Sequence, residues 1–238
     1  MSTNTPKQQA YQLIADEDDF IIINKFPNVH FHSQDGQAGV VAQVELDRKQ
    51  KLYPVHRLDS PTSGLLIFAK SSQTANQLAE LFKAHQVQKY YLAIAKGKPK
   101  KKQGWVIGDM AKSRRGMHKL LHSKQNPAIT QFFSYALQNG LRLYLLKPHS
   151  GKTHQLRVAL TSLGSPILGD PLYGKDDSDR CYLHAYCLEF ELNDKAYFYQ
   201  CVPEIGDAFT TETIKQQLKQ LRQPQLLDWP QSKKKDSR

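Results

Sequence analysis

Long apolar segments are missing from this chain of 238 residues. No run approaches the ~20 apolar residues that a membrane-spanning helix needs. The opening segment MSTNTPKQQAYQ lacks the apolar stretch of a signal peptide. Cysteine is scarce and odd in number, with only Cys181, Cys187 and Cys201, which fits a reducing compartment. We therefore expect a cytoplasmic protein with no membrane segment.

Clustered metal ligands are also scarce. Cys181-x-x-His184-x-x-Cys187 gathers three soft ligands, but a fourth is not evident. The segment CYLHAYCLEFEL around them is typical of a strand, on which positions i and i+3 point to opposite faces. Ordinary packing is the favoured interpretation, and we expect neither a metal nor a nucleotide cofactor.

Basic residues outnumber acidic ones, with 33 Lys+Arg against 22 Asp+Glu and a formal net charge of +11. Such a surface attracts polyanions, whose counterions it releases on binding. A basic protein without such a partner explains the charge equally well. The loop KGKPKKKQG is the densest basic run, and runs of this kind usually serve as solvated tips.

Apolar patterns predict one α+β domain over residues 16–222, with a mixed, largely antiparallel sheet. A polar arm (1–15) and a basic tail (223–238) flank it, and residues 111–126 are expected to be a mobile excursion. Asn139-Gly140 is a strong hairpin signal. The expected elements are buried strands at 19–24 and 65–69, helices at 40–46 and 72–86, hairpin strands at 130–137 and 141–147, and a strand at 182–192.

The stretch HRLDSPTSGLLIFAKS places Asp59 on a turn directly before a buried strand. Burial alone neutralises a carboxylate, which stays charged only beside a cationic or hydrogen-bonding partner. The simplest interpretation is an Asx-type turn, in which the Asp59 side chain bonds nearby backbone and has only a structural role. From this stretch alone, that interpretation is favoured.

Residues 153–163 are predicted to form a helix whose leucines face the core, after a loop that caps it and could hold an anion. His154, Arg157 and Thr161 then share the other face. Arg157 is a credible partner for a buried carboxylate, although exposure is the commoner fate of arginine.

The strand KYYLAIAKG carries Tyr91 on a face with only small neighbours, which leaves room beside the ring for a flat group. Packing beneath a loop is the alternative. The residues by themselves indicate a basic protein with an Asp–Arg–Tyr pocket and no particular reaction.

Four stretches in order resemble the motifs of the RluA-type pseudouridine synthases, which isomerise uridine to pseudouridine in structured RNA. They are DEDDFIIINKFPNVHFH, HRLDSPTSGLLIFAKS, KYYLAIAKG and KPHSGKTHQLRVALTSLGSPILGDPLYG. The resemblance spans roughly residues 16–192. It implies a catalytic domain with a central mixed sheet, flanking helices and a cleft, which needs no cofactor. It also implies a structured RNA partner, either transfer RNA or 23S ribosomal RNA, and we expect a monomer without a separate RNA-binding domain.

By position, the resemblance makes Asp59 the catalytic aspartate, Tyr91 the tyrosine that stacks on the target base, and Arg157 the partner of the aspartate. Arg57 matches the arginine that enters the RNA where the flipped base was. Further RNA contacts are expected from His56, Thr62, His154, Lys100, Lys101 and Lys102. The opening motif departs from the family at Lys25-Phe26-Pro27-Asn28, and histidine is absent at Ala159 and Ser165. These departures leave the RNA target open.

Two other functions fit part of the pattern. One is an inactive RNA-binding protein on the same fold, against which the intact Asp59, Tyr91 and Arg157 argue. The other is a metal-dependent nuclease using Asp59 with His56 and His154. It would need clustered carboxylates, whereas the sequence offers isolated ones.

Overall fold

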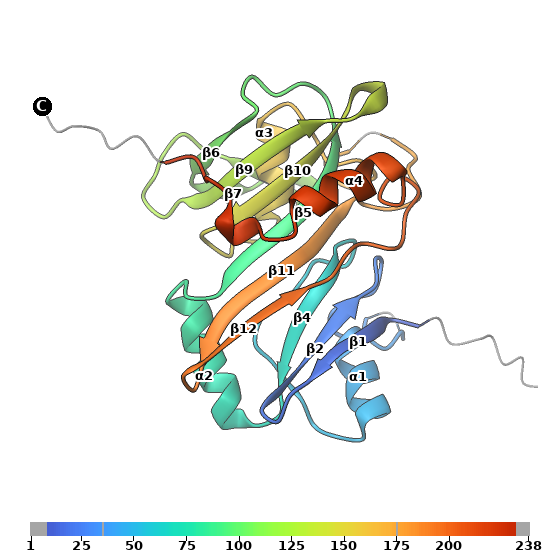
Figure 1. The fold of residues 1–238 in the computed structure, drawn as a ribbon, viewed down its shortest axis with the longest axis vertical. Helices are drawn as coiled ribbons and strands as arrows, with labels where there is room; N and C mark the ends of the chain where they lie inside the picture. The colour runs from blue at the N-terminus through green and yellow to red at the C-terminus, as the bar shows by residue number, and fades with distance from the viewer. Residues whose placement is uncertain (1–8, 35, 175, 232–238) are drawn as a thin grey trace, which may run out of the picture.

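The computed structural model describes residues 9–34, 36–174 and 176–231. Within them, ten strands form one mixed sheet (Figure 1). In spatial order they are β1 (Tyr11–Asp16), β2 (Phe20–Lys25), β4 (Ser63–Ala69), β11 (Leu183–Leu192), β5 (Gln88–Lys96), β10 (Leu141–Pro148), β9 (Ala128–Ala136) and β6 (Gln103–Gly108), with β3 (Tyr53–Pro54) beside β4 and β12 (Lys195–Gln200) beside β11. Among the described strands of this sheet, only β4 and β11 pair in parallel. The expected mixed, mostly antiparallel sheet is confirmed.

Four α-helices flank this sheet within the described residues, which confirms the α+β class. They are α1 (Val40–Arg48), α2 (Ser72–Lys83), α3 (Gln155–Ser162) and α4 (Glu212–Gln220). Figure 1 shows α1 and α2 beside the lower half of the sheet, and α3 and α4 beside the upper half. The predicted start of α2 is confirmed, because the Oγ of Ser71 accepts a hydrogen bond of 3.1 Å from the backbone N–H of Thr74.

Strands β2 and β4 are buried on both faces, as their unbroken apolar runs predict. Ile22 belongs to the apolar cluster that contains Leu78 of α2, whereas Ile21 belongs to the one that contains Val44 of α1. A strand covered on both faces needs no alternation of apolar and polar residues. These two strands therefore form a rigid base for the turn that leads into β4.

Gly64 allows β4 and β11 to meet at the centre of the sheet. The residue has a φ of +112°, and a Cβ there would lie 2.3 Å from the carbonyl oxygen of Ala185, with which Gly64 is in register. Only glycine accommodates both the positive φ and this approach. The turn that carries Asp59 thus enters the sheet where its two halves join.

The structure differs from two expectations about the less regular segments and adds detail to a third. The predicted polar arm (1–15) overlaps β1, which pairs with β2; residues 1–8 lie outside the described residues. In the predicted tail (223–238), Trp229 is buried and its ring centroid lies 4.7 Å from that of Phe133. Within 111–126, β7 (Met110–Lys112) and β8 (His118–Leu120) pair with each other as a hairpin, and the expected mobility of this segment stays a prediction.

The hairpin signal at Asn139-Gly140 is confirmed, since it joins β9 to β10. Both residues have positive φ values, 58° and 72°, which Asn and Gly tolerate best. None of the described helices is long and apolar enough to cross a membrane.

Candidate active site

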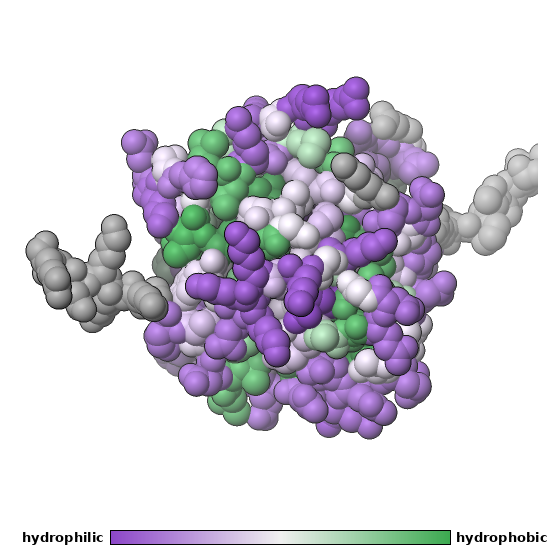
Figure 2. All heavy atoms as spheres, turned by 90° about the horizontal axis from the view of Figure 1, so that it is seen from above, coloured by the Kyte–Doolittle hydropathy of each residue, from purple (hydrophilic) through white to green (hydrophobic). Residues whose placement is uncertain are grey.

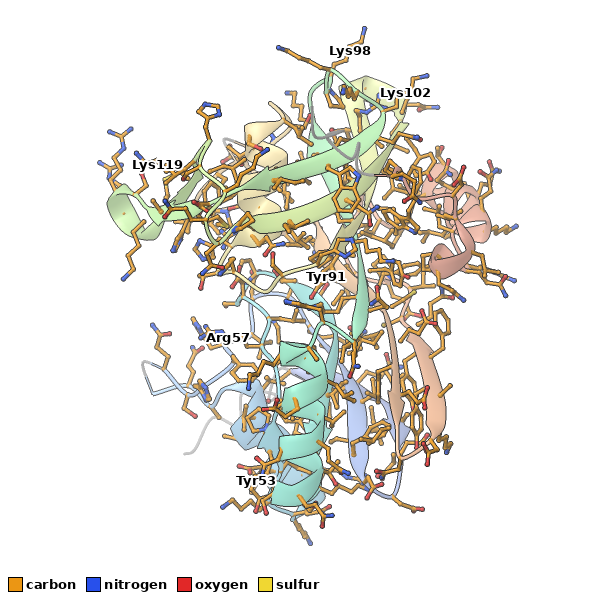
Figure 3. The ribbon with its side chains drawn as sticks, turned by 90° about the vertical axis from the view of Figure 1, so that its left-hand side faces the viewer. Tyr53, Arg57, Tyr91, Lys98, Lys102 and Lys119 are labelled. Carbon is orange, nitrogen blue, oxygen red and sulfur yellow. The ribbon has the colours of Figure 1, made fainter. Side chains whose placement is uncertain are left out.

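A cavity of about 390 Å³ lies where the turn before β4, the end of α2, strand β5 and the loop before α3 meet. Its lining includes every predicted site residue except the three lysines: Arg57, His56, Asp59, Thr62, Tyr91, His154 and Arg157. Figure 3 shows Tyr91 and Arg57 at mid-height, between the two halves of the molecule. Residues from four separate segments thus converge on one concave site.

The turn that carries Asp59 is fixed from below by Lys25, for which the sequence suggested no role beyond membership of a motif. The Lys25 side chain is fully buried, and its Nζ donates to the carbonyl oxygens of Phe26 (2.9 Å), Val29 (3.0 Å) and Ser60 (2.9 Å). Burial, and then the nearby Arg180, lowers the pKa of Lys25 to about 7. A lysine that follows an apolar run and Asn24 at the end of the strand FIIINK was the available signal.

Arg157 lies in the cavity wall as predicted, but its main partner is a residue that sequence reasoning missed. Its Nε and one terminal nitrogen each donate to the carboxylate of Asp170 at 2.7 Å, while the other donates to Asp59 Oδ2 at 3.3 Å. Asp170 also accepts from the backbone N–H groups of Leu172 and Tyr173, at 2.9 and 3.0 Å. The expectation that Arg157 contacts Asp59 is met, but Asp170 holds the guanidinium in place.

Both members of this ion pair are buried, with 2% of Arg157 and 3% of Asp170 exposed. Burial pushes the pKa of Asp170 up, but the hydrogen bonds and charge of Arg157 outweigh it and bring the pKa below its usual value. Burial likewise works to lower the pKa of Arg157, yet Asp170 raises it above its usual value. The pair is therefore ionised, and the charge of Arg157 reaches Asp59 from a fixed position.

Tyr91 presents its ring to the cavity from β5. Burial, and then the charge of Asp59, raises the pKa of the Tyr91 hydroxyl, so the ring stays neutral. The predicted small neighbours Ala93 and Ala95 are fully buried and do not line the cavity. Tyr91 and Asp59 line the same cavity, so a flat group in it can meet both side chains.

His56 and Thr62 line the cavity but also support its floor. The Nε2 of His56 accepts a hydrogen bond of 3.1 Å from Ile67 N–H, and its ring stacks on Phe82 at 4.6 Å. Burial, and then Lys89, lowers the pKa of His56 to about 3, so the ring is uncharged. The backbone N–H of Thr62 closes the turn by donating to the carbonyl oxygen of Asp59 at 3.0 Å. Their RNA contacts stay predictions.

The chain resembles known proteins along most of its length. Residues 19–162 match the family model described as RNA pseudouridylate synthase. An uncharacterized RNA pseudouridine synthase of Haemophilus influenzae is 47% identical over 213 residues, which cover 87% of this chain and 94% of that protein. The chain belongs to the RluA-type RNA pseudouridine synthases. It is an RNA-modifying isomerase, which agrees with the resemblance of its four motifs.

Two further proteins support this family and its fold. The dual-specificity RNA pseudouridine synthase RluA of Escherichia coli is 31% identical over 202 residues, covering 79% of this chain and 90% of that one. The solved structure of human RNA pseudouridylate synthase domain containing 1 superposes with a TM-score of 0.73 at 22% identity, over 93% of this chain and 97% of that one. The pseudouridine synthase fold is thus shared where sequence identity is low.

The synthase carries Lys100, Lys101 and Lys102 away from its cavity. At ~3.3 Å per residue, β5 runs about 17 Å from Tyr91 to Lys96, and the backbone N–H of Gly97 then bonds Gly140 in the β9–β10 turn at 3.3 Å. Figure 3 places Lys98 and Lys102 at the upper end, away from Tyr91 and Arg57. Viewed from above in Figure 2, this end is mostly hydrophilic, with small separate apolar patches. These three lysines therefore do not line the cavity, and their contact with RNA stays a prediction.

Other basic residues of the synthase border the cavity directly. Sequence reasoning did not select them, although Lys89 and Lys152 stand within two of the four motifs; they are Lys83, Lys89 and Lys152. Lys83 is in the last turn of α2, and the Nζ of Lys152 donates to Asn126 Oδ1 at 2.7 Å. The positions of α2, β5 and the loop before α3 bring the three lysines to the rim of the cavity, where they can contact RNA phosphates.

The motif Cys181-x-x-His184-x-x-Cys187 of the synthase is committed to packing. The Nδ1 of His184 lies 2.7 Å from Ser63 Oγ, and its Nε2 lies 2.8 Å from the carbonyl oxygen of Cys201. Burial raises the pKa of the Cys181 and Cys187 thiols to about 12. Among the described residues, no group of three or more His, Cys, Asp and Glu side chains is arranged to hold a metal ion.

Proposed function

We propose that this synthase flips a uridine out of a structured RNA into the cavity and isomerises it with Asp59 as the reacting carboxylate. The observation that carries the proposal is the position of Asp59, 3.3 Å from the buried Arg157 guanidinium and in the same cavity as Tyr91. The cavity volume, about 390 Å³, is within the usual range for ligand sites, which begins at about 300 Å³.

In the proposed reaction the bond from uracil N1 to ribose C1′ breaks, the base turns, and a bond forms between C5 and C1′. The proton on C5 is lost and N1 gains one, so the reaction consumes no oxidant and no nucleotide. Asp59 acts either as a nucleophile on the sugar or as a base toward it. Arg157 supplies a fixed positive charge beside the carboxylate, because Asp170 holds the guanidinium.

Base flipping costs a few kcal/mol, which contacts in the pocket must return. The Tyr91 ring offers a face for the extruded base, and stacking on an aromatic ring contributes ~1–3 kcal/mol. Arg57 lies on the same cavity wall without an ion-pair or hydrogen-bond partner in the described part of the chain. It is therefore available to occupy the gap that the base leaves.

We further propose transfer RNA or 23S ribosomal RNA as the substrate. The net charge of +11 and the rim formed by Lys83, Lys89 and Lys152 support a large polyanion. The E. coli relative is described as dual-specificity, which supports testing both classes of RNA. A cytoplasmic, monomeric enzyme remains the accompanying proposal.

The test uses purified protein in EDTA with carbon-5-tritiated transcripts of total transfer RNA and of 23S ribosomal RNA. Tritium release, followed by mapping of pseudouridine, identifies the substrate class and the position. The Asp59→Asn protein is the control. If the protein binds both classes of RNA but isomerises uridine in neither, the proposed substrate is contradicted. If Asp59→Asn turns over as fast as the wild type, the proposed role of Asp59 is contradicted.

A further inference from the structure

A chain of polar contacts joins the β7–β8 hairpin to Asp59. The backbone N–H of His118, the first residue of β8, donates to the Tyr173 hydroxyl oxygen at 2.7 Å. That hydroxyl lies 3.0 Å from the Nδ1 of His154. The Nε2 of His154 lies 3.9 Å from Asp59 Oδ2. Neither Tyr173 nor the hairpin has a part in the reaction described above.

The direction of these contacts determines where the proton of His154 sits. Because the Tyr173 oxygen already accepts from His118, its own proton is free to be donated to Nδ1 of His154. The imidazole then carries its proton on Nε2, the nitrogen that faces Asp59. Burial, and then the charge of Arg157, lowers the pKa of His154, which agrees with a neutral ring holding a single proton.

The backbone around His154 is built to hold the ring there. His154 has a φ of 57°, in the left-handed region, and directly precedes α3. The next side chain, Gln155, is buried and accepts from Lys152 N–H (3.0 Å) and from the Ser150 hydroxyl (2.7 Å). Its Nε2 donates to the carbonyl oxygen of Ile129 at 3.0 Å. A non-glycine residue in this conformation persists only where its surroundings fix it.

We propose that His154 is a positioning residue for Asp59 and that the β7–β8 hairpin sets its orientation through Tyr173. This proposal rests on the proposed role of Asp59. At 3.9 Å the His154–Asp59 contact is about 1 Å longer than a hydrogen bond. A small shift of the hairpin toward bound RNA therefore closes it, and the Nε2–H then orients the carboxylate toward the sugar.

The hairpin has the charge to follow an RNA backbone. Its basic residues are Lys112, Arg114, Arg115 and Lys119. Figure 3 shows Lys119 at the edge of the upper half, on the same side as Arg57. The rings of His118 and His154 also meet edge to face, with centroids 5.2 Å apart. Movement of the hairpin is thus transmitted to His154 by packing as well as by the hydrogen bonds.

Two substitutions of His154 separate its two nitrogens. His154→Gln keeps a donor near the position of Nε2 and loses the acceptor for Tyr173. His154→Asn keeps an acceptor near Nδ1 and loses the donor toward Asp59. We expect His154→Asn to lower kcat about 10- to 100-fold, as for a hydrogen bond to a charged group, with KM unchanged and with His154→Gln restoring most of the rate. Equal kcat values for the two variants, or a loss confined to KM, would overturn the proposal.

Tyr173→Phe tests the link to the hairpin. The substitution keeps the ring, whose centroid lies 5.1 Å from the Arg157 guanidinium carbon, and removes only the hydroxyl. At saturating RNA we expect a lower kcat in the wild-type background and no further loss in the His154→Asn background, because Tyr173 acts through His154. Multiplicative losses in the double variant would show that Tyr173 acts separately, and would overturn the coupling.

A measurement on the free protein does not depend on turnover. Nitrogen-15 spectra of the imidazole groups report the tautomer of His154, which we expect to carry its proton on Nε2 and to become mixed in Tyr173→Phe. A proton on Nδ1 in the wild type would overturn the proposal even if the enzyme is active. Conversely, an active Asp59→Asn protein would contradict the role of Asp59 while leaving this tautomer as expected, so the two failures are distinguishable.

Discussion

Arg157 and Asp170 form an ion pair with two hydrogen bonds of 2.7 Å between buried side chains. Asp59 accepts only one, at 3.3 Å, from the same guanidinium. The charge that faces Asp59 is therefore held in place by a second carboxylate outside the reaction. Arg157 donates to only one oxygen of the Asp59 carboxylate, Oδ2. The other oxygen can therefore accept a hydrogen bond from the substrate.

Asp59→Asn should abolish isomerisation and leave the fold and the RNA affinity nearly intact. The amide has the same shape but neither attacks the sugar nor accepts its proton, so we expect kcat to fall by at least about 100-fold. Arg157 keeps its bonds to Asp170, so Tm should hardly change. Tritium release, thermal melting and an RNA gel shift measure the three properties. Substantial turnover by this variant would refute the assignment.

Arg157→Ala should damage both stability and activity. Removing one member of a buried ion pair leaves the other charge without a partner, at a cost of about 3–5 kcal/mol in the free energy of unfolding. The stranded group is the buried Asp170 rather than Asp59, whose side chain is more exposed. Denaturant unfolding measures the loss, and Asp59→Asn is the matched control that keeps Arg157 and Asp170. A wild-type unfolding curve for Arg157→Ala would show that the pair contributes nothing.

Asp170 should make the stability of the protein depend on acid pH. Its pKa in the folded state is below the ordinary value of 3.8, so its ionised form stabilises the fold. That stability is present above the unfolded pKa and is lost as pH falls through the lower folded pKa. We expect Asp170→Asn to lower Tm at neutral pH and to flatten the decline of Tm between roughly pH 5 and pH 2. If the Tm of the wild type and that of Asp170→Asn fell equally steeply over this pH range, the prediction would be contradicted.

Tyr91→Phe and Tyr91→Ala should separate the ring from its hydroxyl. The pKa of Tyr91 is raised by burial, so its hydroxyl does not ionise near neutral pH. We expect Tyr91→Ala to lower kcat/KM by the equivalent of ~1–3 kcal/mol, the contribution of one stacked base. Tyr91→Phe keeps the ring and should lose much less. Equal losses in kcat/KM would mean that the hydroxyl, and not the ring face, contacts the base.

The lysines at the cavity rim, Lys83, Lys89 and Lys152, should contribute more to RNA binding than the lysine loop, which is the basic segment from Lys96 to Lys102. Replacing Lys83, Lys89 and Lys152 with alanine should raise KM, leave kcat nearly unchanged, and reduce the salt dependence by up to ~0.9 in log–log slope for each phosphate that these lysines neutralise. The matched control replaces Lys100, Lys101 and Lys102, which changes the net charge equally. A larger decrease of the slope in this control would show that RNA follows the upper end of the molecule instead.

Local pattern was sufficient for the strands, the hairpin and the motif residues. The apolar runs before Asn24 and Ala69 lack alternation because both of their faces are covered, and Asn139-Gly140 tolerates positive φ wherever it occurs. Such signals depend on a few neighbouring residues. The four ordered motifs likewise indicated the family, because each is a continuous stretch of sequence.

Only the tertiary structure decided which residues meet. Asp170 lies in a loop 13 residues after Arg157, and Lys25 bonds Ser60 across 35 residues, pairings for which no short pattern exists. The lysine loop followed Tyr91 in sequence, but an extended strand carried it away from the cavity. The segment at 110–120 is polar and short, so no local pattern predicted its pairing or its contacts with Tyr173 and His154. Sequence specified the chemical groups of the site, whereas long-range packing fixed their distances, because each distance depends on elements that are remote along the chain.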